Sequence, residues 1–138
     1  MVRGTTRRAA GLEPIEREGA EGVLADPDRL ATLMPHLQGV SVLAWLMGSA
    51  SGEPEAVAAL HGPRLRSLIE ALVDTPVRGL VYEAAGSVSP ALLGQGAEIV
   101  REGAETWRMP VQVIEQDPAD GSAWVTEMSA AVAAVLAA

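Results

Sequence analysis

The side chains best suited to chemistry lie near the start of the chain, where two hydroxyl groups and two guanidinium groups follow one another in the run Thr5, Thr6, Arg7 and Arg8. They end a short strand predicted for Val2 to Thr5 and continue beyond it, and no acidic residue occurs from Val2 to Leu12. Hydroxyls donate single hydrogen bonds, and a guanidinium fork can hold a phosphate group through two. The run is therefore a candidate phosphate-binding site. The alternative is a solvated, basic chain end.

Two further candidate ligand contacts follow predicted strands. Gly48 and Ser49 begin a loop after the nearly continuous apolar strand predicted for residues 40–46. Ligands of open parallel sheets bind outside the carboxyl ends of the strands, so this loop is either a ligand contact or a flexible connector. Asp26 follows the strand predicted for residues 22–25. Because Asp-Pro is typical of a helix start, Asp26 either caps the next helix or contacts a ligand.

The residue types give little support for a catalytic centre. The chain has no lysine, which excludes a Schiff base, and no cysteine, which excludes disulfides and thiolate metal sites. Tyr82, the only tyrosine, lies inside a predicted strand, and we expect it to be packed with its hydroxyl hydrogen-bonded. Ser87 and Ser89 have no adjacent base and are predicted to be turn or cap residues.

The remaining polar and aromatic candidates favour structural roles. His36 and His61 show no metal-ligand pattern and are predicted to lie in helices. Glu83 is either a perturbed carboxylate near a ligand cleft or a strand end that faces solvent, and the second is the simpler interpretation. We assign the three tryptophans to core packing: Trp45, Trp107 and Trp124.

Strand and helix patterns alternate along the whole chain. Strands are predicted at residues 2–5, 22–25, 40–46, 78–83 and 111–114. Helices are predicted at 12–18, 26–34, 54–73 with a kink at Gly62-Pro63, 89–103, and from Asp117-Pro118 to the end. No linker or repeat interrupts this alternation. It predicts one α/β domain, residues 1–138, with a mostly parallel sheet and right-handed crossovers.

Composition narrows the possible partners. The 138 residues carry a net charge of −8, which argues against a non-specific nucleic-acid surface or an anionic membrane surface. A small anionic ligand needs only local positive charge and is not excluded. No apolar run is long enough to span a bilayer, and the start is arginine-rich rather than apolar, so we expect a cytoplasmic protein.

Four segments together resemble the short-chain dehydrogenase/reductase superfamily, in its atypical, epimerase-like NAD(P)-binding branch. They are Val2 to Arg7, Ala25 to Pro27, Trp45 to Ser49 and Arg78 to Gly86. The resemblance covers the whole chain and rests on the order and spacing of these segments. It implies a Rossmann-like three-layer fold in which they line the cofactor cleft.

The resemblance implies NADP as the cofactor. A strand that ends in arginine pairs with the 2′-phosphate of NADP, whereas an acidic strand end favours NAD. In the family, an acid at the place of Asp26 contacts the adenine. The implied cofactor contacts are Thr5, Thr6, Arg7, Arg8, Asp26, Gly48 and Ser49.

The sequence departs from the family in two ways. The glycine-rich turn and the first, central strand of the fold do not precede Val2, so we expect an N-terminally truncated unit that binds NADP weakly or not at all by itself. The family's Tyr-x-x-x-Lys is absent, because Gly86 stands four residues after Tyr82. Two hypotheses follow: an NADP-preferring relative of oxidoreductases and epimerases, or a non-catalytic dinucleotide-sensing or protein-interaction module.

Overall fold

The chain packs as two compact units, and every strand pair in both is parallel. A computed structural model describes all residues, 1–138, and divides them into Met1–Gln38 and Gly39–Ala138. The first unit contains a sheet of order β1-β2, and the second a sheet of order β3-β4-β5. Parallel strands that alternate with helical segments confirm the predicted α/β class.

The first unit is a strand–helix–strand crossover. Strand β1 (Arg3–Thr6) leads through helix α1 (Leu12–Arg17) to strand β2 (Glu21–Leu24). The Arg3 guanidinium pairs with Glu21 at 2.9 Å and donates to the backbone carbonyls of His36 and Gln38 at 3.0 and 2.6 Å. One arginine therefore joins the start of both strands to the end of the unit.

The helix predicted for residues 26–34 is wrong. This stretch contains two short 3₁₀ helices instead, Leu30–Thr32 and Met34–Leu37. The Asp26 carboxylate accepts the backbone N–H of Asp28 at 2.9 Å, and the Thr32 hydroxyl donates to the Asp26 carbonyl at 3.0 Å. These local side-chain bonds to the backbone compete with the bonds an α-helix needs.

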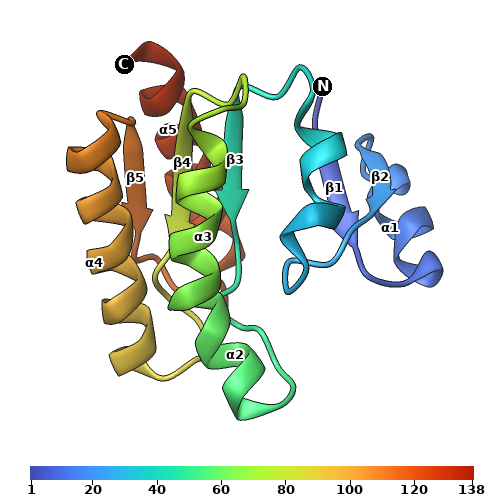
Figure 1. The fold of residues 1–138 in the computed structure, drawn as a ribbon. Helices are drawn as coiled ribbons and strands as arrows, with labels where there is room; N and C mark the ends of the chain where they lie inside the picture. Colours follow the sequence, from blue (N-terminus) through green and yellow to red (C-terminus); the bar gives the residue numbers. More distant parts are fainter. The chain divides into compact units, whose positions relative to one another are not determined.

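The second unit has three layers. Strand β4 (Gly79–Glu83) lies between β3 (Val42–Trp45) and β5 (Val111–Ile114), and all five of its residues are buried. Figure 1 shows α3 (Pro63–Leu72) and α4 (Pro90–Trp107) on one face of this sheet and α5 (Gly121–Ala137) on the other. Helix α2 (Pro54–Leu60) precedes α3 and contacts it. None of the helices combines the length and apolar content needed to cross a bilayer.

Two helix boundaries in the structure differ from the predicted ones. Gly62-Pro63 does more than kink a helix, because it separates α2 from α3. Helix α5 begins after Asp120, whose side chain accepts the backbone N–H of Ala123 at 3.3 Å. The predicted cap, Asp117, instead accepts the backbone N–H of Ala119 in a turn just before the helix.

The second unit has core residues on both faces of its sheet, under α3 and α4 on one side and under α5 on the other. Leu65, Leu68, Ile69 and Leu72 of α3 are all buried, at helical spacing. Trp45 is buried as predicted, and Trp124 is partly buried against the core on the α5 side. The prediction for Trp107 is wrong, because this last residue of α4 is 46% exposed.

Gly96 permits the close approach of α4 to β4 and provides a stability test. A methyl group at this position would collide with the Tyr82 hydroxyl, whereas one at Gly94 in the same helix would meet no atom within 4 Å. Gly96→Ala should lower the free energy of unfolding by about 1–3 kcal/mol through overpacking. The control Gly94→Ala should raise it by up to about 1 kcal/mol through helix propensity. Urea unfolding measures both, and equal effects would contradict the packing argument.

Candidate functional site

The predicted phosphate contacts lie at the carboxyl end of β1. The Thr6 hydroxyl accepts the Arg8 backbone N–H at 3.3 Å and contacts the Arg8 carbonyl at 3.2 Å, which fixes the turn after the strand. Thr5 is exposed at the end of the strand, and Arg7 and Arg8 are exposed beyond it. Neither arginine forms an ion pair, whereas Arg3 and Arg17 each pair with a glutamate. Two adjacent guanidinium groups are thus available to an anion.

Asp26 follows β2 and is half-buried. Its backbone N–H donates to the Thr32 hydroxyl at 2.7 Å, and one carboxylate oxygen accepts the backbone N–H of Asp28. It therefore caps a turn rather than the predicted helix. The carboxyl ends of parallel neighbours meet at one edge of a sheet, so Asp26 belongs to the same edge as the end of β1.

In the second unit, Gly48 and Ser49 bind the loop that follows β4. The Gly48 N–H donates to the Glu83 carboxylate at 2.9 Å, and the Gly48 carbonyl accepts the Val88 N–H at 2.9 Å. The Ser49 hydroxyl oxygen accepts the Ser87 N–H at 3.2 Å and keeps its own proton to donate. Gly86 faces Gly48 with a φ of 136°, which a side chain would not tolerate. Of these two predicted contacts, only Ser49 keeps a polar group for a ligand.

Glu83 is the residue that sequence reasoning misplaced. It is 4% exposed, so the interpretation as a solvent-facing strand end is wrong. One carboxylate oxygen accepts the Gly48 N–H, and the other accepts the Trp124 indole N–H at 2.8 Å. The carboxylate therefore joins the ends of three elements: β4, the loop after β3 and the start of α5. The only signal in the sequence was a glutamate that ends an otherwise apolar strand.

Tyr82 and His61 form a buried hydrogen-bonded pair. The Tyr82 hydroxyl lies 2.6 Å from His61 Nδ1, and His61 Nε2 lies 2.9 Å from the Met47 carbonyl. Because a carbonyl only accepts, Nε2 carries the proton and Nδ1 accepts from the tyrosine. The bonded hydroxyl of Tyr82 is confirmed. The prediction of a helical His61 is wrong, because His61 lies in the turn between α2 and α3.

Burial sets the protonation states of this pair. Desolvation lowers the pKa of His61 from its usual 6.5, only partly offset by the hydrogen bond to the Met47 carbonyl. Desolvation, assisted by the nearby charge of Glu83, raises the pKa of Tyr82. Both side chains are thus held neutral, and the phenol does not become a phenolate near neutral pH.

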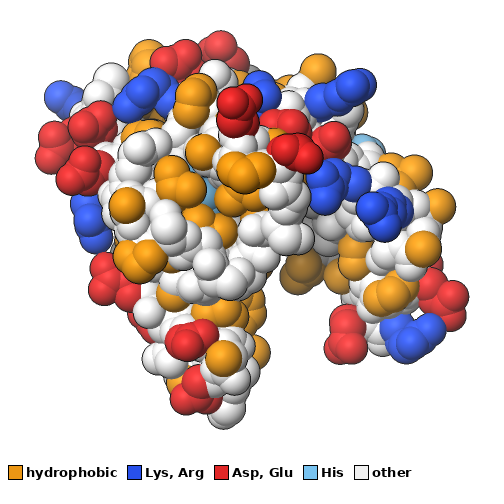
Figure 2. Space-filling model, turned by 90° about the horizontal axis from the view of Figure 1, so that it is seen from below, with side chains coloured by type: hydrophobic (Ala, Val, Ile, Leu, Met, Phe, Trp, Pro, Cys, Tyr) orange, Lys and Arg blue, Asp and Glu red, His pale blue; other side chains and the backbone are white.

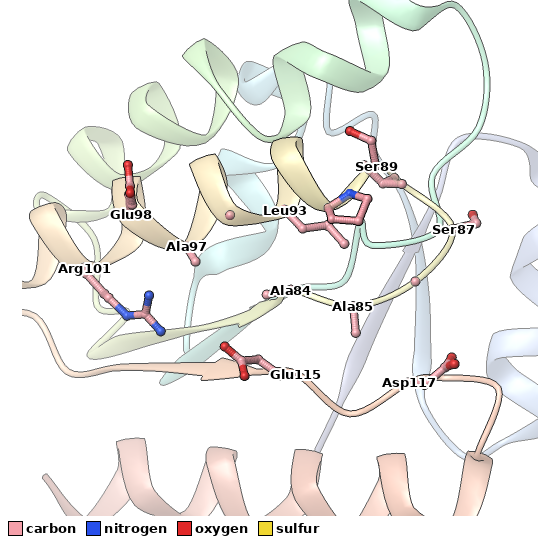
Figure 3. Close-up of a pocket in the computed structure, with 14 residues that line it drawn as sticks. Ala84, Ala85, Ser87, Ser89, Leu93, Ala97, Glu98, Arg101, Glu115 and Asp117 are labelled. Atoms are coloured by element: carbon pink, nitrogen blue, oxygen red, sulfur yellow. The ribbon is translucent and has the colours of Figure 1, made fainter.

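A cavity of about 710 Å³ opens at the carboxyl ends of β4 and β5. Its walls are the loop after β4, the first half of α4 and the segment after β5, and Figure 3 shows Leu93 and Ala97 turned toward its interior. Ser87 and Ser89 are among the lining residues. Ser89 caps α4 by accepting the Leu92 N–H at 3.4 Å, which confirms its predicted role.

Comparison with known proteins identifies the architecture. No protein-family model and no curated protein matches the sequence. The structure is similar to the crystal structure of Citrobacter sp. triphenylmethane reductase complexed with NADP(H), with a TM-score of 0.60 and 16% identity over 83% of this chain. The fold is Rossmann-like.

A second structure of the Citrobacter reductase, described with the bioremediation of triphenylmethane dyes, gives a TM-score of 0.59 at 18% identity. In both comparisons the matched region covers 39% of the reductase chain. The likeness at this identity concerns the fold alone. The Rossmann-like architecture places the predicted ligand contacts at the carboxyl ends of parallel strands, where this class of fold binds its ligands.

The buried histidine predicts a pH dependence of stability. The pKa of His61 is lower in the folded chain than the value of 6.5 expected on unfolding, so the unfolded chain binds the extra proton first. The stabilisation that comes from the neutral His61 side chain is complete above the unfolded-state pKa of 6.5 and is lost as the pH falls below it. We expect the free energy of unfolding to drop by up to about 1.4 kcal/mol per pH unit below about pH 6.5. Urea unfolding between about pH 7.5 and pH 5 measures it. His61→Gln should abolish the drop, and His36→Gln should keep it. A wild-type-like slope in His61→Gln would assign the effect elsewhere.

The Glu83 carboxylate predicts a second stability effect. Trp124→Phe leaves one buried carboxylate oxygen without its N–H donor, and Glu83→Gln replaces one acceptor with a second donor. Each should lower the free energy of unfolding by about 1–3 kcal/mol. The control Glu98→Gln removes an exposed carboxylate of α4 and should change it by less than about 0.5 kcal/mol. Thermal and urea unfolding compare the three, and a silent Glu83→Gln would show that the two bonds contribute little.

Proposed function

We propose that the chain is the dinucleotide-binding part of an NADP-preferring relative of the epimerase-like short-chain dehydrogenases/reductases. Its Rossmann-like fold and its structural likeness to a reductase crystallised with NADP(H) support the proposal. The observation that carries it is the pair of exposed arginines, Arg7 and Arg8, free of ion pairs at the carboxyl end of β1.

The chemistry of the pair favours a phosphate over a ribose hydroxyl. A ribose 2′-hydroxyl at a strand end needs a carboxylate to accept its proton, and residues 1–12 contain no acid. A 2′-phosphate needs cationic donors, and a guanidinium fork supplies two parallel hydrogen bonds. The Thr6 hydroxyl holds the turn on which both arginines stand, and the exposed Thr5 hydroxyl is a further donor. In this proposal Asp26 contacts the adenine, and Ser49 stays a predicted cofactor contact.

The site lacks the family's proton-transfer group. The Tyr82 hydroxyl is buried and bonded to His61, and the chain contains no lysine to lower a tyrosine pKa. This observation favours a second candidate function, a non-catalytic dinucleotide-sensing or protein-interaction module. Preference for NADPH without its oxidation in the presence of carbonyl compounds would favour the sensor.

The phosphate selectivity is tested with Arg7→Ala. A charge-assisted hydrogen bond contributes about 1.5–3 kcal/mol, so the substitution should weaken NADPH binding by about ten- to a hundredfold and leave NADH nearly unchanged. No Gly-x-Gly-x-x-Gly turn occurs in the sequence to hold the pyrophosphate, so whole dinucleotides should bind weakly. The same comparison is therefore also made with 2′,5′-ADP against 5′-AMP, which probe the adenosine end.

Arg17→Ala is the matched control, because Arg17 is an exposed arginine of α1 that pairs only with Glu13 of the same helix. It should leave both affinities unchanged. Fluorescence or NMR titration at fixed salt measures them. Equal losses for the phosphorylated and unphosphorylated ligands in Arg7→Ala would contradict the proposed role of this arginine.

A further inference from the structure

Strand β3 is one edge of the three-stranded sheet in the second unit, and its outer backbone groups are unpaired. The residues of a parallel strand bond alternately to its two neighbours. Leu80 and Ala84 donate to carbonyls on the β5 side, so Val81 bonds to β3. The register places Val81 opposite Ala44, so its bonds go to the residues on either side of Ala44. The N–H and C=O of Val42 and Ala44 therefore point to the open edge, and neither residue has another backbone partner.

This edge lacks the devices that usually prevent pairing with another chain, which are charged side chains, prolines and bulges. Residues 39–52, which contain β3 and its flanks, include no charged residue and no proline. The other edge of the same sheet, β5, is bracketed by Pro110 and Glu115. In the first unit, Arg3 stands on β1 and Glu21 on β2. Strand β3 is therefore the edge that is open to pairing.

The side chains along this edge are apolar. Val42 packs against the core cluster that contains Val81 and Ile114. Ala44 points to the same face of the sheet as Val42 and is exposed. Leu46 follows the strand and is 39% exposed. A strand placed beside β3 would remove this apolar surface from water and supply partners for the free backbone groups.

We propose that β3 pairs with β3 of a second copy of this chain, antiparallel about a two-fold axis at Leu43. Val42 of one protomer then lies opposite Ala44 of its partner. The two residues exchange both of their N–H···O bonds, because the free groups of each face the other. The same pair recurs on the far side of the axis, so every free group of Val42 and Ala44 is used. Leu46 of one protomer meets Val40 of its partner.

Two properties favour a second copy over a different partner strand. The pairing residues carry no charge, so the net charge of −8 on each protomer stays outside the contact. Seen toward the carboxyl ends of the strands, charged side chains lie around the rim of the larger unit, and apolar or uncharged atoms fill its middle (Figure 2). The contact is also isologous and closes as a dimer, whose joined sheet ends on both sides at the protected strand β5. A different strand would add a new edge of its own.

The oligomeric state and the exchange of two amides test the proposal, which does not rest on the proposed dinucleotide function. Sedimentation equilibrium of the full chain should show a dimer, and the amides of Val42 and Ala44 should exchange more slowly as the concentration rises. Higher salt should strengthen the dimer, because it screens the repulsion between protomers of net charge −8. A chain that stays monomeric up to about 1 mM would overturn the proposal. Slow exchange of both amides at every concentration would also overturn it, because another part of the chain would then cover the edge.

Variants of Ala44 localise the contact. Ala44→Pro removes the N–H that faces the partner and no bond to β4, as proline is tolerated on the open side of an edge strand. By symmetry two pairing bonds are lost, so the dimer dissociation constant should rise by about tenfold or more. Ala44→Lys places a charge opposite Val42 and should act in the same direction.

Gln112→Lys is the matched control, because it adds the same charge to an exposed side chain of the other edge strand. It should leave the dimer unchanged, and circular dichroism checks that all three variants are folded. A dimer that both Ala44 variants leave intact would place the contact elsewhere and overturn the proposal. Equal weakening by Gln112→Lys and Ala44→Lys, with no effect of Ala44→Pro, would overturn it too.

Discussion

The carboxylate of Glu83 is the constraint on which the carboxyl-terminal edge of the sheet in the second unit depends. It ends the one strand that is buried along its whole length, and its two oxygens bind the loop after β3 and the start of α5. A buried carboxylate without a cationic partner is costly unless N–H donors replace the lost water. The two donors meet that requirement. They also fix both loops at the edge where a Rossmann-like sheet binds its ligands.

The ends of different strands differ in their local charge. At the end of β1 the sequence has no acid, and two guanidinium groups stand free of ion pairs. The cavity at the ends of β4 and β5 is lined by the carboxylates of Glu98, Glu115 and Asp117 and by the Arg101 guanidinium. Local charge therefore differs between the two places and does not simply follow the overall negative charge of the chain.

The pair Tyr82–His61 gives the only tyrosine of the chain a structural role. The hydroxyl is turned into the core toward His61, and Gly96 leaves the space for it. Burial of both groups favours their neutral forms, so the proton of the Tyr82 hydroxyl stays in the core and is not exchanged with solvent as a phenolate forms. A tyrosine in this position is a structural group that links β4 to the turn between α2 and α3.

The sequence by itself determined the α/β class, the ends of β5, the cap at Ser89 and the bonded hydroxyl of Tyr82. These depend on local alternation, local capping and the need of a buried phenol for a partner. Only the tertiary structure decided that Glu83 is buried and that His61 accepts the hydrogen bond of the Tyr82 hydroxyl. It also decided that the Gly48 N–H is bonded to the Glu83 carboxylate. Those contacts join residues 21 to 41 positions apart in the chain. Periodicity carries no information about such partners, because it reports which face of an element is apolar and not which polar group lies opposite it.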